Sequence, residues 1–175
     1  MAMETVQIST FGTDFGPVTV ASTEKGVVCS SLPGGDADAV RGWVARHVDG
    51  AALVDGGLWN AKPIKAMRDY LAGKRAGLDD VSVDMRGTPF QVKVWTELRR
   101  VPYGATISYA DLARQAGHPG ASRACGTANG SNPLPLFTPC HRVIASDGSL
   151  GGFGGGLALK RRLLELEGSL QAVEA

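Results

Sequence analysis

The sequence is organised around one hexapeptide, Pro139-Cys140-His141-Arg142-Val143-Ile144. A histidine next to a cysteine favours a reactive sulfur, because the thiolate is the nucleophile and a neighbouring base helps to form it. The proline before Cys140 stiffens the backbone there. The alternative is that Cys140 is a small buried hydrophobic side chain, as most free cysteines are. The hexapeptide alone leaves both interpretations open.

The segments on either side of the hexapeptide favour a pocket for a flat molecule. Residues 132–139 are rich in proline, so they cannot form a helix and hold the cysteine rigidly. Residues 147–156 contain six glycines and one aromatic residue, Phe153. Glycine lets backbone groups approach a ligand, and an aromatic ring can cover a planar one.

Composition predicts a soluble protein of one domain or two small ones. The chain has 175 residues, of which 43% are hydrophobic and 20% charged. It shows no secretory signal and no apolar run of the roughly 20 residues that cross a bilayer. Cys29, Cys125 and Cys140 are far apart in the sequence, which indicates free thiols in a reducing compartment. We therefore expect a cytoplasmic protein.

Charge is distributed unevenly along the chain. Residues 1–85 hold 8 basic and 11 acidic side chains, whereas residues 86–175 hold 10 basic and 6 acidic ones. The second half therefore favours an anionic partner. A protein that binds nucleic acid through phosphate contacts alone is usually more basic, so shape and specific pockets would have to contribute.

Residues 1–85 are predicted to form an α/β scaffold domain that contains a small antiparallel sheet. Three β-branched runs separated by turn residues predict its strands, at 6–10, 17–23 and 26–32. Cys29 lies in the third run, where we expect a structural thiol because nothing basic flanks it.

Two helices and one further strand complete this domain. A helix is predicted over 36–48, because Asp36 can cap it and apolar residues follow at helical spacing. A second is predicted over 62–72, with Gly73 placed to end it. A strand-like run at 81–85 then precedes the predicted domain boundary.

Residues 86–175 are predicted to form a mostly helical domain. Thr88 and Pro89 are placed to begin one helix. Two short helices follow, over about 108–116 and 121–130, and Ser108 can cap the first of them. The glycine-containing turn between them predicts a helix-turn-helix. A last helix is predicted over 157–168. On it, three basic side chains are expected to be exposed: Lys160, Arg161 and Arg162.

The helix over 121–130 is unusual because nearly all of its residues are small. A helix that reads the major groove usually carries several long polar side chains, and this one has Arg123 and Asn129. Small residues permit close approach to a narrow groove, with Arg123 free to enter the duplex. The alternative is a helix packed inside the domain, where Cys125 would serve packing.

Taken together, these residues resemble the O6-alkylguanine-DNA alkyltransferase family, also called methylated-DNA-protein-cysteine S-methyltransferases. The resemblance covers essentially the second half, in ordered matches at 89–95, 102–104, 108–109, 122–124, 132–133, 139–144 and 155–168. It implies a helix-turn-helix in the C-terminal domain. It also implies that the N-terminal domain is ribonuclease-H-like and has no catalytic role.

The resemblance implies single-turnover DNA repair, in which Cys140 takes the alkyl group from O6-alkylguanine and keeps it as a thioether. His141, reached through a water and oriented by Glu167, would accept the thiol proton. Asn132 would brace the site by hydrogen bonds. Tyr109 would act as a general acid on the guanine N3. Activity on O4-alkylthymine stays open.

The resemblance also implies a partner, double-stranded DNA whose damaged base is rotated out from the minor groove. The expected DNA-binding residues are Arg123, Ser122, Ala124, Thr127 and Ala128. The expected walls of the alkylguanine pocket are Asn129, Pro135, Val143, Leu150, Phe153, Gly154 and Gly155. The carbonyls of Cys140 and Val143 would hold the exocyclic amine, and the Gly154 amide would face O6. We expect a monomer in solution, and cooperative binding on DNA stays open.

The chain departs from the family pattern at two pocket positions. Phe153 stands where many members have tyrosine, and Asn129 stands where some have a larger apolar residue. We expect no cofactor and no zinc, because Cys29 and His47 are the only soft ligands in the N-terminal half and a structural zinc site needs four.

Two other functions remain open at this point. The helix-turn-helix would also suit a module that binds lesions or regulates transcription without alkyl transfer. A cysteine beside a histidine would also suit a hydrolase that acts on acyl groups. Such a hydrolase would need an oxyanion hole, and the helix that carries Arg123 would have no role in it.

Overall fold

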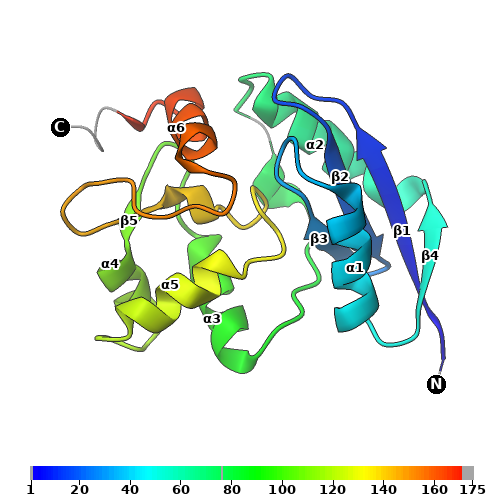
Figure 1. The fold of residues 1–175 in the computed structure, drawn as a ribbon, viewed down its shortest axis with the longest axis horizontal. Coiled ribbons are helices and arrows are strands. Elements are labelled where there is room, and N and C mark those ends of the chain that lie inside the picture. The colour runs from blue at the N-terminus through cyan, green and yellow to red at the C-terminus, as the bar shows by residue number, and fades with distance from the viewer. Residues whose placement is uncertain (1, 76, 171–175) are drawn as a thin grey trace. The chain divides into compact units, whose positions relative to one another are not determined.

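The computed structural model describes residues 2–75 and 77–170, and Figure 1 shows the course of the chain. The chain divides into two compact units: Met1–Arg86 with Pro133–Phe137, and Gly87–Asn132 with Thr138–Ala175. The outer ends of the two predicted domains, at Met1 and at 171–175, lie outside the described residues.

In the described part of the chain, the first unit is built on a four-stranded mixed sheet with the order β3-β2-β1-β4. β1 (Glu4–Phe11), β2 (Val18–Thr23) and β3 (Gly26–Ser30) pair antiparallel. β4 (Ala51–Asp55) pairs with β1 in parallel, so the prediction of an antiparallel sheet is wrong. The sequence does not reveal β4 because this edge strand is mostly exposed and lacks the alternation of a half-buried strand.

The helix α1 (Ala37–His47) covers the sheet and begins and ends close to the predicted bounds. The Asp36 side chain accepts a hydrogen bond from the Asp38 amide, which confirms the predicted cap. Val40 and Val44 are buried in one cluster with residues of β1, β2 and β3. The apolar spacing therefore identified the correct face of this helix.

The helix α2 (Ala61–Leu71) also lies close to its predicted bounds, directly after the 3₁₀ helix η1 (Leu58–Asn60). Gly73 follows α2 with a φ angle of +87°, a left-handed conformation that glycine adopts at no steric cost. A second 3₁₀ helix, η2 (Leu78–Asp80), comes next.

The predicted strand at 81–85 is reduced to an isolated parallel bridge between Val83 and Val27. Val27 donates to the Ser82 carbonyl at 2.9 Å, and the Asp84 amide donates to the Val27 carbonyl at 2.7 Å. A β-branched run therefore indicated an extended segment but not its pairing.

The second unit contains helices and one pair of two-residue strands. Its described elements are α3 (Pro89–Leu98), β5 (Ile107–Ser108), α4 (Tyr109–Gln115), α5 (Ser122–Gly130), the 3₁₀ helix η3 (Cys140–Arg142), β6 (Val143–Ile144) and α6 (Leu157–Leu166). β5 and β6 pair in parallel, with Ile107 opposite Val143. This parallel pairing places the start of α4, which follows β5, next to the segment that follows β6, and Figure 1 shows α4 beside α5.

Local capping fixes where α3 and α4 begin. The Thr88 hydroxyl and the Gln91 side chain form a reciprocal capping box at α3. The Ser108 hydroxyl accepts a hydrogen bond from the Asp111 amide at the start of α4. Both caps confirm predictions made from the sequence, since they depend only on residues close together in the chain.

Between Asn132 and Thr138 the chain makes an excursion. Residues 133–137 pack with the first unit, where the Ser30 amide donates to the Pro133 carbonyl at 2.9 Å. The Asn132 side-chain amide donates to the Thr138 carbonyl at 2.8 Å. This bond closes the base of the excursion two residues before Cys140, and so fixes the approach to the hexapeptide.

Candidate active site

Cys140 is the first residue of η3 and is only 7% exposed. Its amide donates to the Thr138 carbonyl at 2.8 Å, and its side chain joins the buried cluster of the second unit together with Val94, Cys125 and Val143. The sulfur therefore lies inside the fold and not on an open surface.

The environment of Cys140 favours a thiol at rest. Burial raises the pKa of Cys140, while a hydrogen bond from Asn132 and the positive charge of Lys160 act in the opposite direction without outweighing it. Desolvation is the dominant effect, so the free protein favours the protonated form of Cys140. A base must remove the proton before the sulfur can react.

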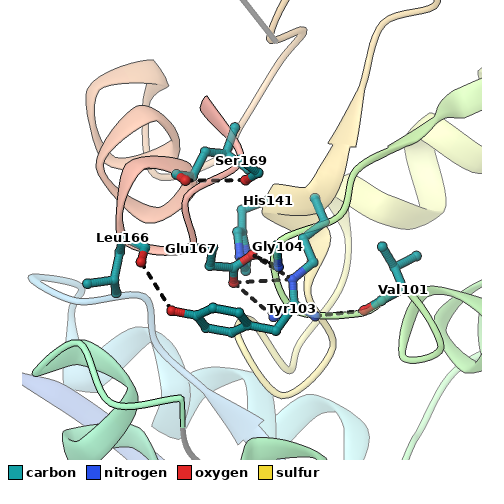
Figure 2. A network of polar contacts seen from close by, with 9 residues as sticks. Val101, Tyr103, Gly104, His141, Leu166, Glu167 and Ser169 are labelled. Carbon is teal, nitrogen blue, oxygen red and sulfur yellow. Dashed lines mark hydrogen bonds and ion pairs between the residues drawn. The ribbon is translucent and has the colours of Figure 1, made fainter. Parts of the chain in front are cut away.

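His141 and Glu167 form a buried pair next to the cysteine. The His141 Nε2 atom lies 2.7 Å from Glu167 Oε1, and the two side chains are 1% and 0% exposed. The sequence predicts this partner for the histidine, and the structure brings the two side chains together (Figure 2).

Arg142 is a third member of this group that sequence reasoning missed. Its Nε and Nη2 atoms donate to the Glu167 carboxylate at 2.9 and 2.8 Å, and its Nη1 donates to the Val101 carbonyl at 2.7 Å. The residue is only 4% exposed. Arginine in a motif is usually taken as a surface charge. The signal that could have found its role is the acid at the end of the last helix, where the helix dipole disfavours a negative charge and a basic partner is expected.

Further hydrogen bonds hold the end of α6 in place (Figure 2). The Tyr103 hydroxyl donates to the Leu166 carbonyl at 3.1 Å, and the Ser169 hydroxyl donates to the Leu164 carbonyl at 3.2 Å. The Glu167 backbone is therefore fixed independently of its side chain. A carboxylate on a fixed backbone orients the imidazole that it contacts.

The pKa shifts of His141 and Glu167 indicate which of the two side chains carries a proton. Burial alone would raise the pKa of Glu167, but hydrogen bonds from His141 and Arg142 outweigh it and lower the pKa to about 2. Burial lowers the pKa of His141 despite the opposing effect of Glu167. An ionised carboxylate can only accept, so the neutral imidazole donates through Nε2 and carries its lone pair on Nδ1. His141 is thus able to accept a proton at neutral pH.

Lys160 lies beneath the site, contrary to the prediction that it is exposed. It is 0% exposed, and its Nζ donates to the carbonyls of Val143 at 2.6 Å, of Gly152 at 3.2 Å and of Leu150. Burial lowers its pKa to about 8, although the nearby Cys140 acts to raise it. The sequence held a signal, because Lys160 shares the helical face of Leu163 and Leu164 by its spacing.

Tyr109 is the first residue of α4 and lies between two glycines. A Cβ atom at Gly151 would lie 3.3 Å from the Tyr109 hydroxyl, and one at Gly126 would lie 3.7 Å from its ring. Burial and then the charge of Cys140 raise the pKa of Tyr109, so the phenol keeps its proton at neutral pH.

The predicted pocket residues fall into different places. Asn129 is buried and its Nδ2 donates to the Cys140 carbonyl at 3.4 Å. Phe153 packs against the cluster that contains Cys140, with Lys160 Nζ 6.0 Å from its ring centre. Of the five others, Val143 and Leu150 are buried and their carbonyls both accept from Lys160. Gly154 and Gly155 are exposed, and Pro135 lies in the segment that packs with the first unit.

The outer face of α5 carries most of the predicted DNA-binding residues. Arg123, Ala124 and Thr127 are exposed, and Ser122 is partly buried. Ala128 is the exception, because it is 3% exposed and its carbonyl accepts a hydrogen bond from Trp95. The Ala128 side chain therefore faces the core and does not form part of this exposed face, and its contact with DNA stays a prediction.

Cys29, the cysteine of the first unit, does not lie in a reactive environment. Cys29 is buried, and burial raises its pKa to about 12 even though Arg46 acts to lower it. Within residues 2–75 and 77–170, no group of three or more His, Cys, Asp or Glu side chains could hold a metal ion. Across the same residues, no helix is long and apolar enough to cross a membrane.

Comparison with known families identifies residues 89–169 as matching the profile of "6-O-methylguanine DNA methyltransferase, DNA binding domain". The chain is 51% identical over 106 residues to a methylated-DNA–protein-cysteine methyltransferase of Mycobacterium bovis, and 48% identical over 104 residues to one of Salmonella typhimurium. The first alignment covers 61% of this chain and 64% of the relative; the second covers 59% and 61%. The chain thus matches less than two thirds of the length of these curated relatives.

Solved structures extend the similarity to both units. The crystal structure of the Mycobacterium tuberculosis O6-methylguanine methyltransferase is 37% identical, covers 94% of this chain and 93% of its own, and superposes with a TM-score of 0.78. A structure described as Mycobacterium tuberculosis OGT in complex with DNA is 34% identical, covers 97% of this chain and 99% of its own, and has a TM-score of 0.77. The mixed α/β fold is therefore shared along nearly the whole chain.

The lowered pKa of Glu167 makes the stability of the protein depend on pH in a defined window. A carboxylate whose pKa falls from 4.5 unfolded to about 2 folded stabilises the protein above pH 4.5, and this contribution is lost as the pH falls towards 2. We expect the stability advantage of the wild type over Glu167→Gln to shrink by about 3 kcal/mol across that window. Urea unfolding at several pH values measures it. Glu165→Gln, an exposed neighbour, is the control, and an advantage that is constant with pH would contradict the assignment.

The buried charge of Lys160 should set the reactivity of the Cys140 thiol. Because the ammonium stabilises the thiolate while Lys160 is protonated, Lys160→Met should slow alkylation of Cys140 by iodoacetamide about tenfold below pH 8 and raise the thiol pKa by about one unit. Peptide mass spectrometry of Cys140 across a pH series measures both. Arg161→Met, on the next and exposed residue, is the control, and an unchanged pH midpoint in Lys160→Met would refute this role.

Proposed function

The chain belongs to the O6-methylguanine-DNA methyltransferase family, and we propose that it repairs DNA by moving an alkyl group from O6-alkylguanine onto its own Cys140. The observation that carries this proposal is the enclosed Cys140 followed by a neutral His141 that Glu167 holds at 2.7 Å. All three residues lie within the segment that matches the family profile. DNA is the proposed partner, in keeping with the DNA complex of a related protein.

The transfer is a single displacement at the alkyl carbon. The Cys140 sulfur forms a bond to this carbon while the bond from the carbon to O6 breaks, and guanine leaves with the electron pair. The thiol proton passes to His141, and the departing guanine takes up a proton. The products are S-alkylcysteine and guanine. Water does not cleave a thioether, so each protein molecule acts once.

His141 serves as the base, and Glu167 keeps it ready. The imidazole is neutral because burial lowers its pKa, and donation from Nε2 to Glu167 leaves the Nδ1 lone pair to receive a proton. A water bridges His141 to the thiol in this proposal. Asn132 supports the thiolate by a hydrogen bond and fixes the backbone through the Thr138 carbonyl.

Tyr109 serves as the acid that assists the leaving group. Its raised pKa keeps the phenol protonated at neutral pH, and it lies on α4 between Gly126 and Gly151 near the sulfur that raises its pKa. A hydrogen bond from this phenol to the guanine N3 would stabilise the negative charge that develops on the base.

The DNA-binding surface is proposed to be α5, in a helix-turn-helix with α4. Its exposed face carries Ala124 and Thr127, which permit close approach to the minor groove. Arg123 projects from the same face and would fill the gap left when the damaged base rotates out of the stack. The extruded guanine would enter the site beside Asn129 and Phe153.

The two units have separate roles in this proposal. The second unit, from Gly87 onward, binds DNA and accepts the alkyl group. The first unit is a ribonuclease-H-like scaffold, in keeping with its mixed sheet and covering helix α1, and it takes no part in the chemistry.

Transfer from O4-alkylthymine would use the same acceptor, Cys140. Comparing duplexes that contain O6-methylguanine with duplexes that contain O4-methylthymine tests directly whether the protein accepts this second lesion.

Methyl transfer is tested by intact-mass measurement after the protein is mixed with a duplex that contains O6-methylguanine. We expect the wild type to gain the mass of one CH₂ group, stoichiometrically and without turnover, and peptide mapping to place it on Cys140. Cys140→Ala should gain nothing, whereas Cys125→Ala should react like the wild type because Cys125 is a core residue. Tight lesion binding without any mass gain would sink the proposal and favour a lesion-binding module.

The proposed role of Arg123 separates base rotation from chemistry. Arg123→Ala should slow transfer from duplex DNA by about tenfold or more, because the gap in the stack is no longer filled. It should leave transfer from the free base O6-methylguanine unchanged, since a free base needs no extrusion. Arg114→Ala, which removes an exposed arginine of α4, is the matched control. Equal losses with both substrates, or no loss with duplex DNA, would overturn this role.

A further inference from the structure

Lys160 is a buried cation whose ammonium is held by backbone carbonyls. It lies on α6 beside two buried leucines and is 0% exposed. Its Nζ atom donates to the carbonyls of Val143 at 2.6 Å, of Gly152 at 3.2 Å and of Leu150. A third leucine would suit this face of the helix without the cost of removing an ammonium from water. The buried charge therefore calls for a function.

The three carbonyls use the whole donor capacity of the ammonium. A lysine ammonium has three N–H groups, and each carbonyl takes one. None is left to donate to the Cys140 sulfur, so Lys160 favours the thiolate only through the charge that it places nearby. A lysine that served the thiol alone would direct an N–H group at the sulfur. The three bonds therefore indicate a second task, which is to hold the backbone in place.

The backbone that Lys160 holds is part of the glycine-rich segment before α6. Residues 150–152 lie in no helix or strand, and among the described residues they form no hydrogen bond to another backbone group. The Leu150 side chain also packs in an apolar cluster, whereas Gly152 has no side chain to pack. The bonds from Lys160 are therefore the main restraint on the backbone just before Phe153.

This segment borders the place that the extruded base is proposed to occupy. A Cβ atom at Gly151 would lie 3.3 Å from the Tyr109 hydroxyl, so the backbone passes close to the proposed acid. Phe153 packs against the buried cluster that contains Cys140. Lys160 ties the segment to β6, which directly follows the turn that carries the sulfur. One ammonium thus connects the backbone beside the acid with the backbone beside the sulfur.

We propose that Lys160 is a positioning residue whose ammonium holds residues 150–153 in place as a wall of the pocket that receives the extruded base. This inference rests on the proposed function and deepens it. A wall that is already ordered avoids the free-energy cost of ordering it when the base enters. Lys160 thereby sets the preference of the protein for DNA that contains the lesion, separately from its effect on Cys140.

Binding measured without the sulfur separates the two effects of Lys160. Cys140→Ala can neither accept an alkyl group nor form a thiolate, so its Kd can be compared between a duplex with O6-methylguanine and the same duplex with guanine. We expect Cys140→Ala to bind the first more tightly, and Lys160→Met in the same background to reduce that preference about tenfold. Affinity for the guanine duplex should not change, because the proposed DNA-binding face is on α5. Arg161→Met, on the next and exposed residue, is the control.

The position of the wall is tested by digestion with chymotrypsin, which cleaves after aromatic residues. Cleavage after Phe153 requires local release of the backbone, so Lys160→Met should speed it about tenfold, and the fragment masses identify the site. Cleavage after Phe137, which is 1% exposed, reports unfolding of the whole fold and should not change. Equal rates at Phe153 with and without Lys160 would refute the restraint.

The outcomes separate this inference from the proposed function. If the wild type gains no mass from the O6-methylguanine duplex, the proposed function fails, whereas the binding and cleavage results still decide the role of Lys160. If Cys140→Ala shows no preference for the lesion, this wall holds no base and the inference is refuted. A preference that is unchanged in Lys160→Met would also overturn it. So would an equal loss of affinity for both duplexes, because Lys160 would then serve the fold alone.

Discussion

The hydrogen-bonded carboxylate of Glu167 is the interaction on which the second unit depends. Its oxygens accept hydrogen bonds from His141 and Arg142, which are both in η3. Arg142 also donates to the carbonyl of Val101, which follows α3 in the chain. Three segments that are distant in the sequence are thus joined through one buried anion. Removing one partner of such a group leaves an uncompensated charge, which typically costs about 3–5 kcal/mol. The group that orients the base therefore also holds the fold around it.

A balance of opposing effects controls the sulfur. Burial keeps Cys140 protonated, whereas Asn132 and Lys160 favour the thiolate to a smaller degree. In the proposed single transfer this arrangement would protect the acceptor, because a protonated and enclosed thiol reacts slowly with oxidants and stray electrophiles. The thiolate would then form only when His141 takes the thiol proton in the presence of a bound DNA base.

Local features of the chain could be predicted well, and long-range ones could not. The caps at Asp36, Thr88 and Ser108 depend on neighbouring residues, and each was found. The parallel pairing of β4 (Ala51–Asp55) depends on a strand more than forty residues away and leaves little burial pattern to detect. The buried Lys160 was missed because its charge was given more weight than its helical spacing. The proximity of His141 to Glu167 could be inferred, because an acid at a helix C-terminus requires a partner. The roles of the site residues remain predictions.

The excursion at 133–137 means that no single cut divides this chain into its two units. Leu134, Leu136 and Phe137 are at most 2% exposed, and they pack with the first unit although they are flanked on both sides by the second. A fragment that begins at Gly87 would carry these three apolar side chains without the surface that buries them. Expressing the second unit on its own would therefore require a redesigned loop in place of these five residues.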